Sequence, residues 1–466
     1  MAQNKIAQFF SPRDMTTGST SSAIIQFTIP LLIGNIAQQL YSTVDSIVVG
    51  QYVGDNALAA VGASGPVTNL LLVLFVGIST GAGIMVSQFF GARDKQMLSK
   101  TIGNTLVMTL LAGIVMMLMG VFLSRPFLEL LDTPAEILDM AATYLRIIFI
   151  GIIGFAFYNI LSGILRGLGD SFMPLVFLLV CCGLNIVLDL LFVACFKMGV
   201  AGVAWATILS WAVSAVLCFI KIFRMKDELA LTKESLKLDG HLCRDLILLG
   251  LPSGATQAIF SLSMVIVQSL TNSMGTDVIA CNVIIMRVDG FAMMPNFSFG
   301  MAMTTFVGQN VGANRMDRVE EGTKNGLKMG VGTAAVLVLC LLFFGKYLIE
   351  MFTRTEHLIE LSINMLRVLA VGYVAMAVTQ ILSGVMRGAG DTVSPMWISL
   401  VTTVAIRVPL AYLFAFLTRN EARPHGEPIA LFLSMLISWL GGALITFLVY
   451  RRGKWKAKSV TKKKAR

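Results

Sequence analysis

The chain has 466 residues, of which 56% are hydrophobic and only 13% are charged, and its mean hydropathy is +0.79. A soluble domain cannot bury so much apolar surface, so this composition excludes a soluble or disordered protein and predicts a multi-pass membrane protein. The net charge of +10 does not indicate a nucleic-acid partner, because much of it follows the last apolar run, where contact with anionic membrane lipid explains it.

The apolar runs, taken in chain order, predict the transmembrane helices. Residues 1–22 form a polar leader without a small-residue cleavage site, so we expect the first apolar run to be retained. A transmembrane helix needs about 20 mostly apolar residues. Twelve runs of this kind follow the leader: 23–49, 57–86, 101–123, 141–164, 172–196, 200–222, 246–272, 278–307, 326–350, 362–385, 394–417 and 428–450. We therefore predict an all-α membrane protein with twelve transmembrane helices.

Two short motifs indicate that the chain is an internal repeat. Residues 165–170 read LRGLGD and residues 386–391 read MRGAGD, at an offset of 221 residues. The same offset relates Gly91 to Gly312, and parallel repeats of two hydrophobic halves are a recurring architecture of secondary transporters. The predicted parts are a cytoplasmic leader at 1–22, an N-lobe of six helices at 23–222, a cytoplasmic linker at 223–245, a C-lobe of six helices at 246–450 and a basic cytoplasmic tail at 451–466.

The charges outside the apolar runs predict the orientation in the membrane. Roughly 26 of the 36 Lys and Arg residues lie in the leader, the loops after even-numbered runs, the linker and the tail, which the positive-inside rule assigns to the cytoplasm. Both termini are then cytoplasmic, and we expect the protein in the cell membrane. The seven cysteines form no CxxC or Cys/His pattern, so we predict neither a disulfide nor a structural metal.

Carboxylates inside the predicted spans are the first candidates for a functional site, because ionisable groups are costly in hydrocarbon. In the first span, Gln38, Tyr41 and Asp45 recur at helical spacing and therefore share one face. We expect Gln38 and Tyr41 to support Asp45. Pro30 lies earlier in the same span, and because proline removes a helical hydrogen bond, it is a candidate hinge.

Two further spans carry polar residues at a comparable depth. Asp189 follows Asn185 by one helical turn in the fifth span, and Thr207 lies about 9 Å along the sixth. Together with Asp45 they offer two carboxylates, an amide and a hydroxyl, which suit a sodium ion or a shared proton. The sequence does not choose between these ions. The plainer interpretation is that each aspartate only bonds to a neighbouring helix or to interfacial water.

The C-lobe lacks this polar set. At the repeat offset Asp45, Asn185, Asp189 and Thr207 correspond to Ile266, Ile406, Leu410 and Pro428. This asymmetry indicates that only the N-lobe holds the ion site.

The C-lobe carries charges of its own, Arg287 and Asp289 in the eighth span and Arg407 in the eleventh. Asp289 and Arg407 lie at similar depths, and we expect them to pair. Both remain secondary candidates for contact with substrate.

With these residues assembled, the chain resembles the multidrug and toxic compound extrusion (MATE) family, in the prokaryotic branch that keeps carboxylates in the first lobe. The resemblance covers nearly the whole chain and rests on residues 14–18, Pro30 with residues 41–50, residues 91–93, the two Arg-Gly-x-Gly-Asp turns, and Asn185 with Asp189. It implies two lobes that rock between inward- and outward-open states. It also implies that Asp45, Asn185, Asp189 and Thr207 form the cation site and that the first helix bends at Pro30.

The expected function is a cation-coupled antiporter that expels amphipathic, often cationic, organic compounds in exchange for protons or sodium. Its partners would be these small organic substrates, the coupling ion and membrane lipid, with no other cofactor, and we expect a monomer. A flippase for lipid-linked precursors or polysaccharide, from the same superfamily, is the alternative. An enzyme is not expected, because the three histidines show no metal spacing and no nucleophile motif is present.

Overall fold

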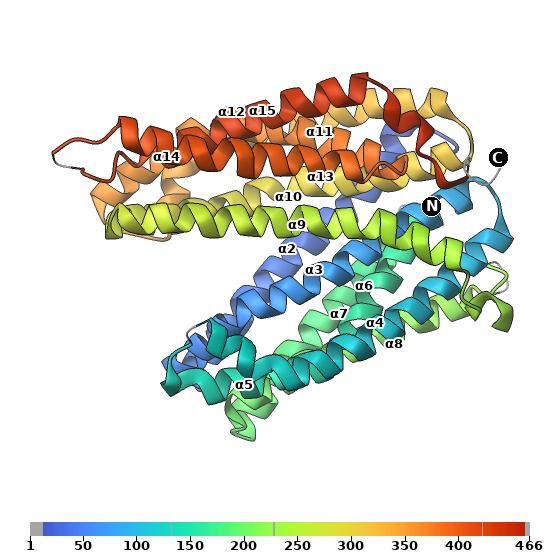
Figure 1. The fold of residues 1–466 in the computed structure, drawn as a ribbon, viewed down its shortest axis with the longest axis horizontal. Helices are drawn as coiled ribbons and strands as arrows, with labels where there is room; N and C mark the ends of the chain where they lie inside the picture. The colour runs from blue at the N-terminus through green and yellow to red at the C-terminus, as the bar shows by residue number, and fades with distance from the viewer. Residues whose placement is uncertain (1–12, 132, 227–228, 422, 462–466) are drawn as a thin grey trace, which may run out of the picture. The chain divides into compact units, whose positions relative to one another are not determined.

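The computed structural model describes residues 13–131, 133–226, 229–421 and 423–461, and these residues are almost entirely helical (Figure 1). The first half contains α2 (Thr20–Tyr52), α3 (Asp55–Gly91), α4 (Lys95–Leu130), α5 (Ala135–Ile150), α6 (Ile152–Gly167), α7 (Phe172–Asp189), η1 (Leu190–Cys195), α8 (Gly199–Arg224) and η2 (Lys233–Leu236). The second half contains α9 (Gly240–Ser273), α10 (Thr276–Gly312), α11 (Met316–Glu350), α12 (Glu356–Gly388), α13 (Val393–Ser399), η3 (Leu400–Ile406), α14 (Arg407–Leu417), α15 (Ile429–Arg451) and η4 (Lys454–Ala457).

The lengths of these helices match a membrane protein. Within the described residues, 11 helices are long and apolar enough to span a bilayer, and the pair α5 and α6, bent by 49°, raises the number to as many as 12. The predicted all-α class and the duplicated arrangement of spans are therefore confirmed. In two places the helix widens to π geometry, at η1 and at η3, and such turns often occur at functional sites.

The repeated Arg-Gly-x-Gly-Asp turns have the same conformation in both halves. Gly169 and Gly390 have φ values of 91° and 98°, a region that favours glycine. The aspartate of each turn then accepts hydrogen bonds from the start of the next helix. Asp170 accepts from Met173 N at 2.9 Å, and Asp391 accepts from Ser394 N at 3.2 Å. Each turn thus ends one helix and caps the next.

Equivalent glycines also allow the same close helix crossing in each half. A Cβ added to Gly163 of α6 would lie 2.8 Å from the carbonyl oxygen of Ser79 in α3. A Cβ on Gly384 of α12, the repeat partner of Gly163, would lie 2.2 Å from the carbonyl oxygen of Gly300 in α10. Small residues at these crossings let the backbones approach, which is how membrane helices gain packing energy.

The chain forms two compact units, and two helices belong to both. The first unit contains Met1–Met15 and Ile29–Gly254, and the second contains Thr16–Thr28 and Ala255–Arg466. The boundary of the units therefore falls inside α2 and inside α9, whereas the sequence-based lobes divide at the linker. Pro30 lies just after the boundary in α2, and Pro252 lies just before the boundary in α9.

Candidate cation-coupling site

Three helices of the first unit bring the predicted polar residues together. Asp45 lies in the second half of α2, and Asp189 is the last residue of α7, immediately before the π-helical turn η1. The two carboxyl groups are close enough for their charges to interact. Asp189 is fully buried. Packing of α2 against α7 thus brings together Asp45 and Asp189, which are 144 residues apart in the sequence.

Asn185 connects Asp189 to the third helix. When the side-chain amide of Asn185 is oriented so that its nitrogen and its oxygen both have partners, the nitrogen donates to Asp189 Oδ2 at 2.8 Å and the oxygen accepts from Thr207 N at 3.1 Å. Thr207 in α8 is buried, and its hydroxyl donates to Val203 O at 3.0 Å. The amide therefore fixes one oxygen of Asp189 and leaves the other free.

Two tyrosines border the carboxylates. The Tyr41 hydroxyl, one turn before Asp45, lies within the electrostatic reach of both aspartates. Tyr144 of α5 also lies within the electrostatic reach of both. Tyr144 was not predicted, because a tyrosine in a mostly apolar run carries no signal of its neighbours. Gln38 is exposed in the structure, so Tyr41 is the member of the predicted supporting pair that reaches the carboxylates.

A buried valine cluster covers one end of this site. Val49 follows Asp45 by one turn, Val193 follows Asp189 by one turn, and Val203 precedes Thr207 by one turn. All three valines pack together in one apolar cluster, which Tyr144 also contacts. Because each polar residue has an apolar neighbour on the same side, water is excluded from that end of the site.

The free oxygen atoms of the two carboxylates make this site suitable for a cation. Asp45 Oδ1 and Asp189 Oδ1 are buried and have no hydrogen-bond partner. Two negative charges side by side in an apolar environment are costly unless a proton or a cation lies between them. The described residues hold no group of three or more His, Cys, Asp or Glu side chains that could bind a metal. A sodium ion would therefore depend on Asn185 and Thr207 for its remaining oxygen ligands.

The charged residues of the second unit are arranged differently from the prediction. Asp289 accepts a hydrogen bond from the hydroxyl of Tyr373, which is fully buried. In the described structure Arg407 reaches Asp289 only through its charge, without a direct ion pair, and its Nη2 lies 3.6 Å from Met435 Sδ. Among the described residues Asp289 and Arg407 thus form no direct ion pair, and packing of α10 against α12 makes Tyr373 the hydrogen-bond partner of Asp289. No local pattern in the sequence indicated Tyr373 as a partner of Asp289.

Comparison with known proteins agrees with the duplicated architecture. The family model described as MatE matches the chain twice, at residues 30–191 and 252–413. YoeA of Bacillus subtilis, a probable multidrug resistance protein, is 28% identical over 445 residues, which cover 94% of each chain. YpnP of Bacillus subtilis, with the same description, is 29% identical over 450 residues, covering 95% of this chain and 98% of YpnP. A crystal structure of MATE in complex with MaL6 has a TM-score of 0.87 at 25% identity, covering 94% of this chain and 97% of the other.

Proposed function

Because this chain belongs to the MatE family of membrane transporters, we propose that it is a secondary active multidrug exporter. It expels amphipathic, often cationic, organic compounds and takes up protons or sodium ions in exchange. Relatives described as probable multidrug resistance proteins support this assignment of substrate class. The cycle needs no cofactor other than the coupling ion.

The observation that carries the proposal is the pair of carboxylates in the first unit. Asp45 and Asp189 lie close together, and each has one buried oxygen atom without a partner. Charged groups placed at such cost inside a membrane protein are typical of ion pathways. The pair can hold one cation, either a proton on a carboxylate or a sodium ion that Asn185 and Thr207 also bind.

Binding of the ion changes the conformational equilibrium only if the two states bind it with different affinity. Asp45 is on α2, whereas Asn185, Asp189 and Thr207 are on α7 and α8. A bend of α2 at Pro30 would move Asp45 relative to the other three residues and so change the affinity. Occupation of the site by the ion would favour one bend of α2, and release of the ion would favour the other. Pro30 is therefore the proposed hinge.

The valine cluster gives the site one closed end. Val49, Val193 and Val203 would have to separate before an ion could enter from that side. We propose that this end faces outward, with both chain termini in the cytoplasm, and that one chain acts as a monomer. Cysteine labelling of residues in α15 and in the loop before α5 from either side of the membrane would test this orientation.

The deciding experiment uses the purified full-length chain in vesicles. Ethidium efflux is measured under an imposed proton gradient and, separately, under an imposed sodium gradient. We expect efflux under at least one gradient, and the effective gradient identifies the coupling ion. Absence of ion-driven efflux in vesicles that contain correctly inserted protein would refute the proposal. Transport of a lipid-linked sugar by the same vesicles would favour the flippase alternative instead.

A further inference from the structure

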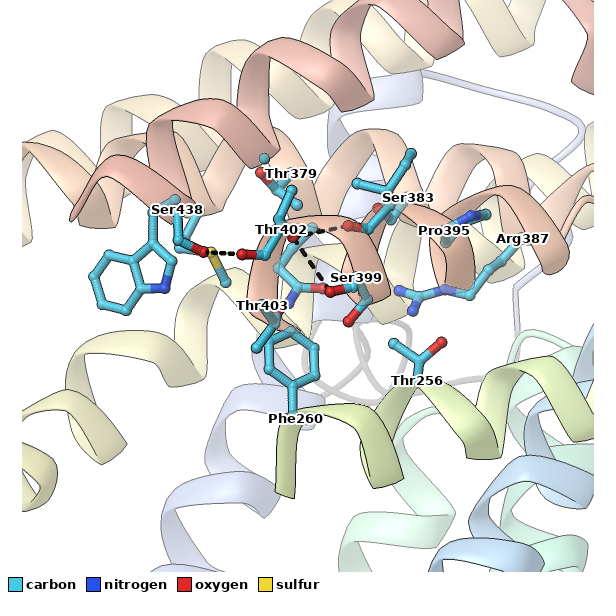
Figure 2. Close-up of a pocket in the computed structure, with 15 residues that line it drawn as sticks. Thr256, Phe260, Thr379, Ser383, Arg387, Pro395, Ser399, Thr402, Thr403 and Ser438 are labelled. Carbon is cyan, nitrogen blue, oxygen red and sulfur yellow. Dashed lines mark hydrogen bonds between the residues drawn. The ribbon is translucent and has the colours of Figure 1, made fainter. Parts of the chain in front are cut away.

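Arg387 carries a charge for which the described structure supplies no partner. It lies in the last turn of α12 and lines a cavity of about 40 Å³ within the second unit (Figure 2). Its side chain is partly buried and takes part in no hydrogen bond or ion pair among the described residues. A guanidinium is always protonated, and placing it unpaired in a membrane-embedded bundle is costly. The charge of Arg387 is therefore available to a negatively charged ligand in the cavity.

The wall of the cavity supplies hydroxyl groups and no carboxylate. None of the 15 residues that line it is acidic. Ser399, at the end of α13, is 7% exposed, and its Oγ has no hydrogen-bond partner. Figure 2 shows the side chains of Thr256 and Arg387 turned toward the space beside Ser399. Burying a hydroxyl without a hydrogen-bond partner costs free energy, which indicates that a bound ligand supplies the missing hydrogen bond.

The π-helical turn η3 exposes backbone carbonyls, which would repel an anion, but hydroxyl groups of other helices occupy them. Widening of the helix frees backbone carbonyls, and two serines from other helices bind them. Ser438 of α15 donates to Thr402 O at 2.8 Å, and Ser263 of α9 donates to Thr403 O at 2.7 Å. With these carbonyls occupied, the Arg387 guanidinium and the Ser399 hydroxyl remain as donors without a partner at the cavity.

Two hydroxyl groups of the lining are specific to the second half of the chain. At the offset of 221 residues, Ser399 corresponds to Leu178, and Thr402 corresponds to Cys181. Arg387 itself corresponds to Arg166, whose neighbours are Tyr158 and Cys218. The arginine is thus common to both halves, but the hydroxyl groups of Ser399 and Thr402 are not.

The size of the cavity limits the ligand. A buried water needs about 10–15 Å³ by this measure, and drug-sized sites measure about 300–1,000 Å³. The cavity, at about 40 Å³, has room for a monatomic ion with a water molecule and none for an organic substrate. We propose that the second unit binds one small inorganic anion of the halide class, held by the Arg387 guanidinium and the Ser399 hydroxyl. This site goes beyond the proposed export function and does not depend on it.

Radioactive chloride binding to the purified full-length chain tests the proposal. Scintillation proximity is measured with ³⁶Cl⁻ while gluconate keeps the ionic strength constant. We expect saturable binding that Arg387→Gln weakens by about tenfold or more, because a charge-assisted hydrogen bond is lost. Ser399→Ala, which preserves the charge and the packing of α12, should weaken binding several-fold.

The matched control is Arg166→Gln, which removes the equivalent arginine of the first unit and should leave chloride binding unchanged. Thermal unfolding of each variant in gluconate identifies any that fail to fold. The proposal is overturned if the wild-type chain shows no saturable chloride binding, or if folded Arg387→Gln and Ser399→Ala bind chloride as the wild type does. An equal loss in Arg166→Gln would also overturn it. A crystal with bromide should show an anomalous peak beside Arg387, and a peak at other sites only would contradict it.

Discussion

The two units share a scaffold and differ in the polar residues that line their interiors. Each has a glycine turn whose aspartate caps the next helix, and each has a helix crossing that only glycine permits. In the first unit, however, Asp45 lies near Asp189, whereas in the second unit Arg387 lines a cavity together with hydroxyl groups. Duplication thus preserves the positions that fix the backbone and leaves the buried polar positions free to acquire opposite functions.

The largest expected effect comes from removing a carboxylate of the first unit. Asp189→Asn or Asp45→Asn should reduce ion-driven dye efflux by about 5- to 150-fold, the usual range of a coupling free energy. Efflux from vesicles under each imposed gradient measures this. Asp289→Asn is the matched control in the second unit, where Tyr373 already satisfies the carboxylate, and it should retain most of the activity. A larger loss in Asp289→Asn than in Asp189→Asn would place the coupling site in the second unit.

The next effect concerns the amide that orients Asp189. Asn185→Ala removes the 2.8 Å hydrogen bond to Asp189 Oδ2 and should raise the ion concentration needed for half-maximal efflux by about tenfold. The maximal rate should change less, since both carboxylates remain. Efflux measured over a series of proton or sodium concentrations separates the two quantities. An unchanged ion dependence in this variant would show that Asn185 has only a packing role.

The shared scaffold predicts equal losses of stability in the two units. Gly163→Ala and Gly384→Ala each force a Cβ against a backbone carbonyl, and overpacking of this kind costs about 1–3 kcal/mol. Thermal unfolding of the purified variants measures this. Gly441→Ala, where no atom lies within 4 Å of the added Cβ, is the control and should unfold as the wild type does. Stability loss in one unit alone would contradict equivalence of the crossings.

The smallest expected effect is a loss of stability at the π-helical turn η3 of the second unit. Ser438→Ala leaves the carbonyl of Thr402 without its bond from α15 and should cost about 0.5–1.5 kcal/mol of stability. Ser261→Ala is the control, because Ser261 is exposed and bonds only within its own helix, to Gln257 O. Thermal unfolding in the presence and absence of chloride measures both variants. Equal stability of the two would indicate that η3 does not need Ser438.

Much of the fold was predictable because its signals are local. The apolar runs are long enough to mark each span, and the Arg-Gly-x-Gly-Asp turns identify the repeat. The grouping of Asp45 with Asp189 followed from counting residues along helices of known rise. Pairings that depend on side-chain packing were not accessible in this way. Asp289 accepts a hydrogen bond from Tyr373, and Tyr144 of α5 lies within the electrostatic reach of both carboxylates.

The sequence by itself determined the all-helical class, the number of spans and the duplication, since hydrophobic length and turn chemistry act over short distances along the chain. Tertiary structure alone decided that the starts of α2 and α9 belong to the opposite units, and that Arg387 and Ser399 line one cavity. These features depend on which helix faces pack together. Residues far apart in sequence meet there, and no local pattern encodes their distance.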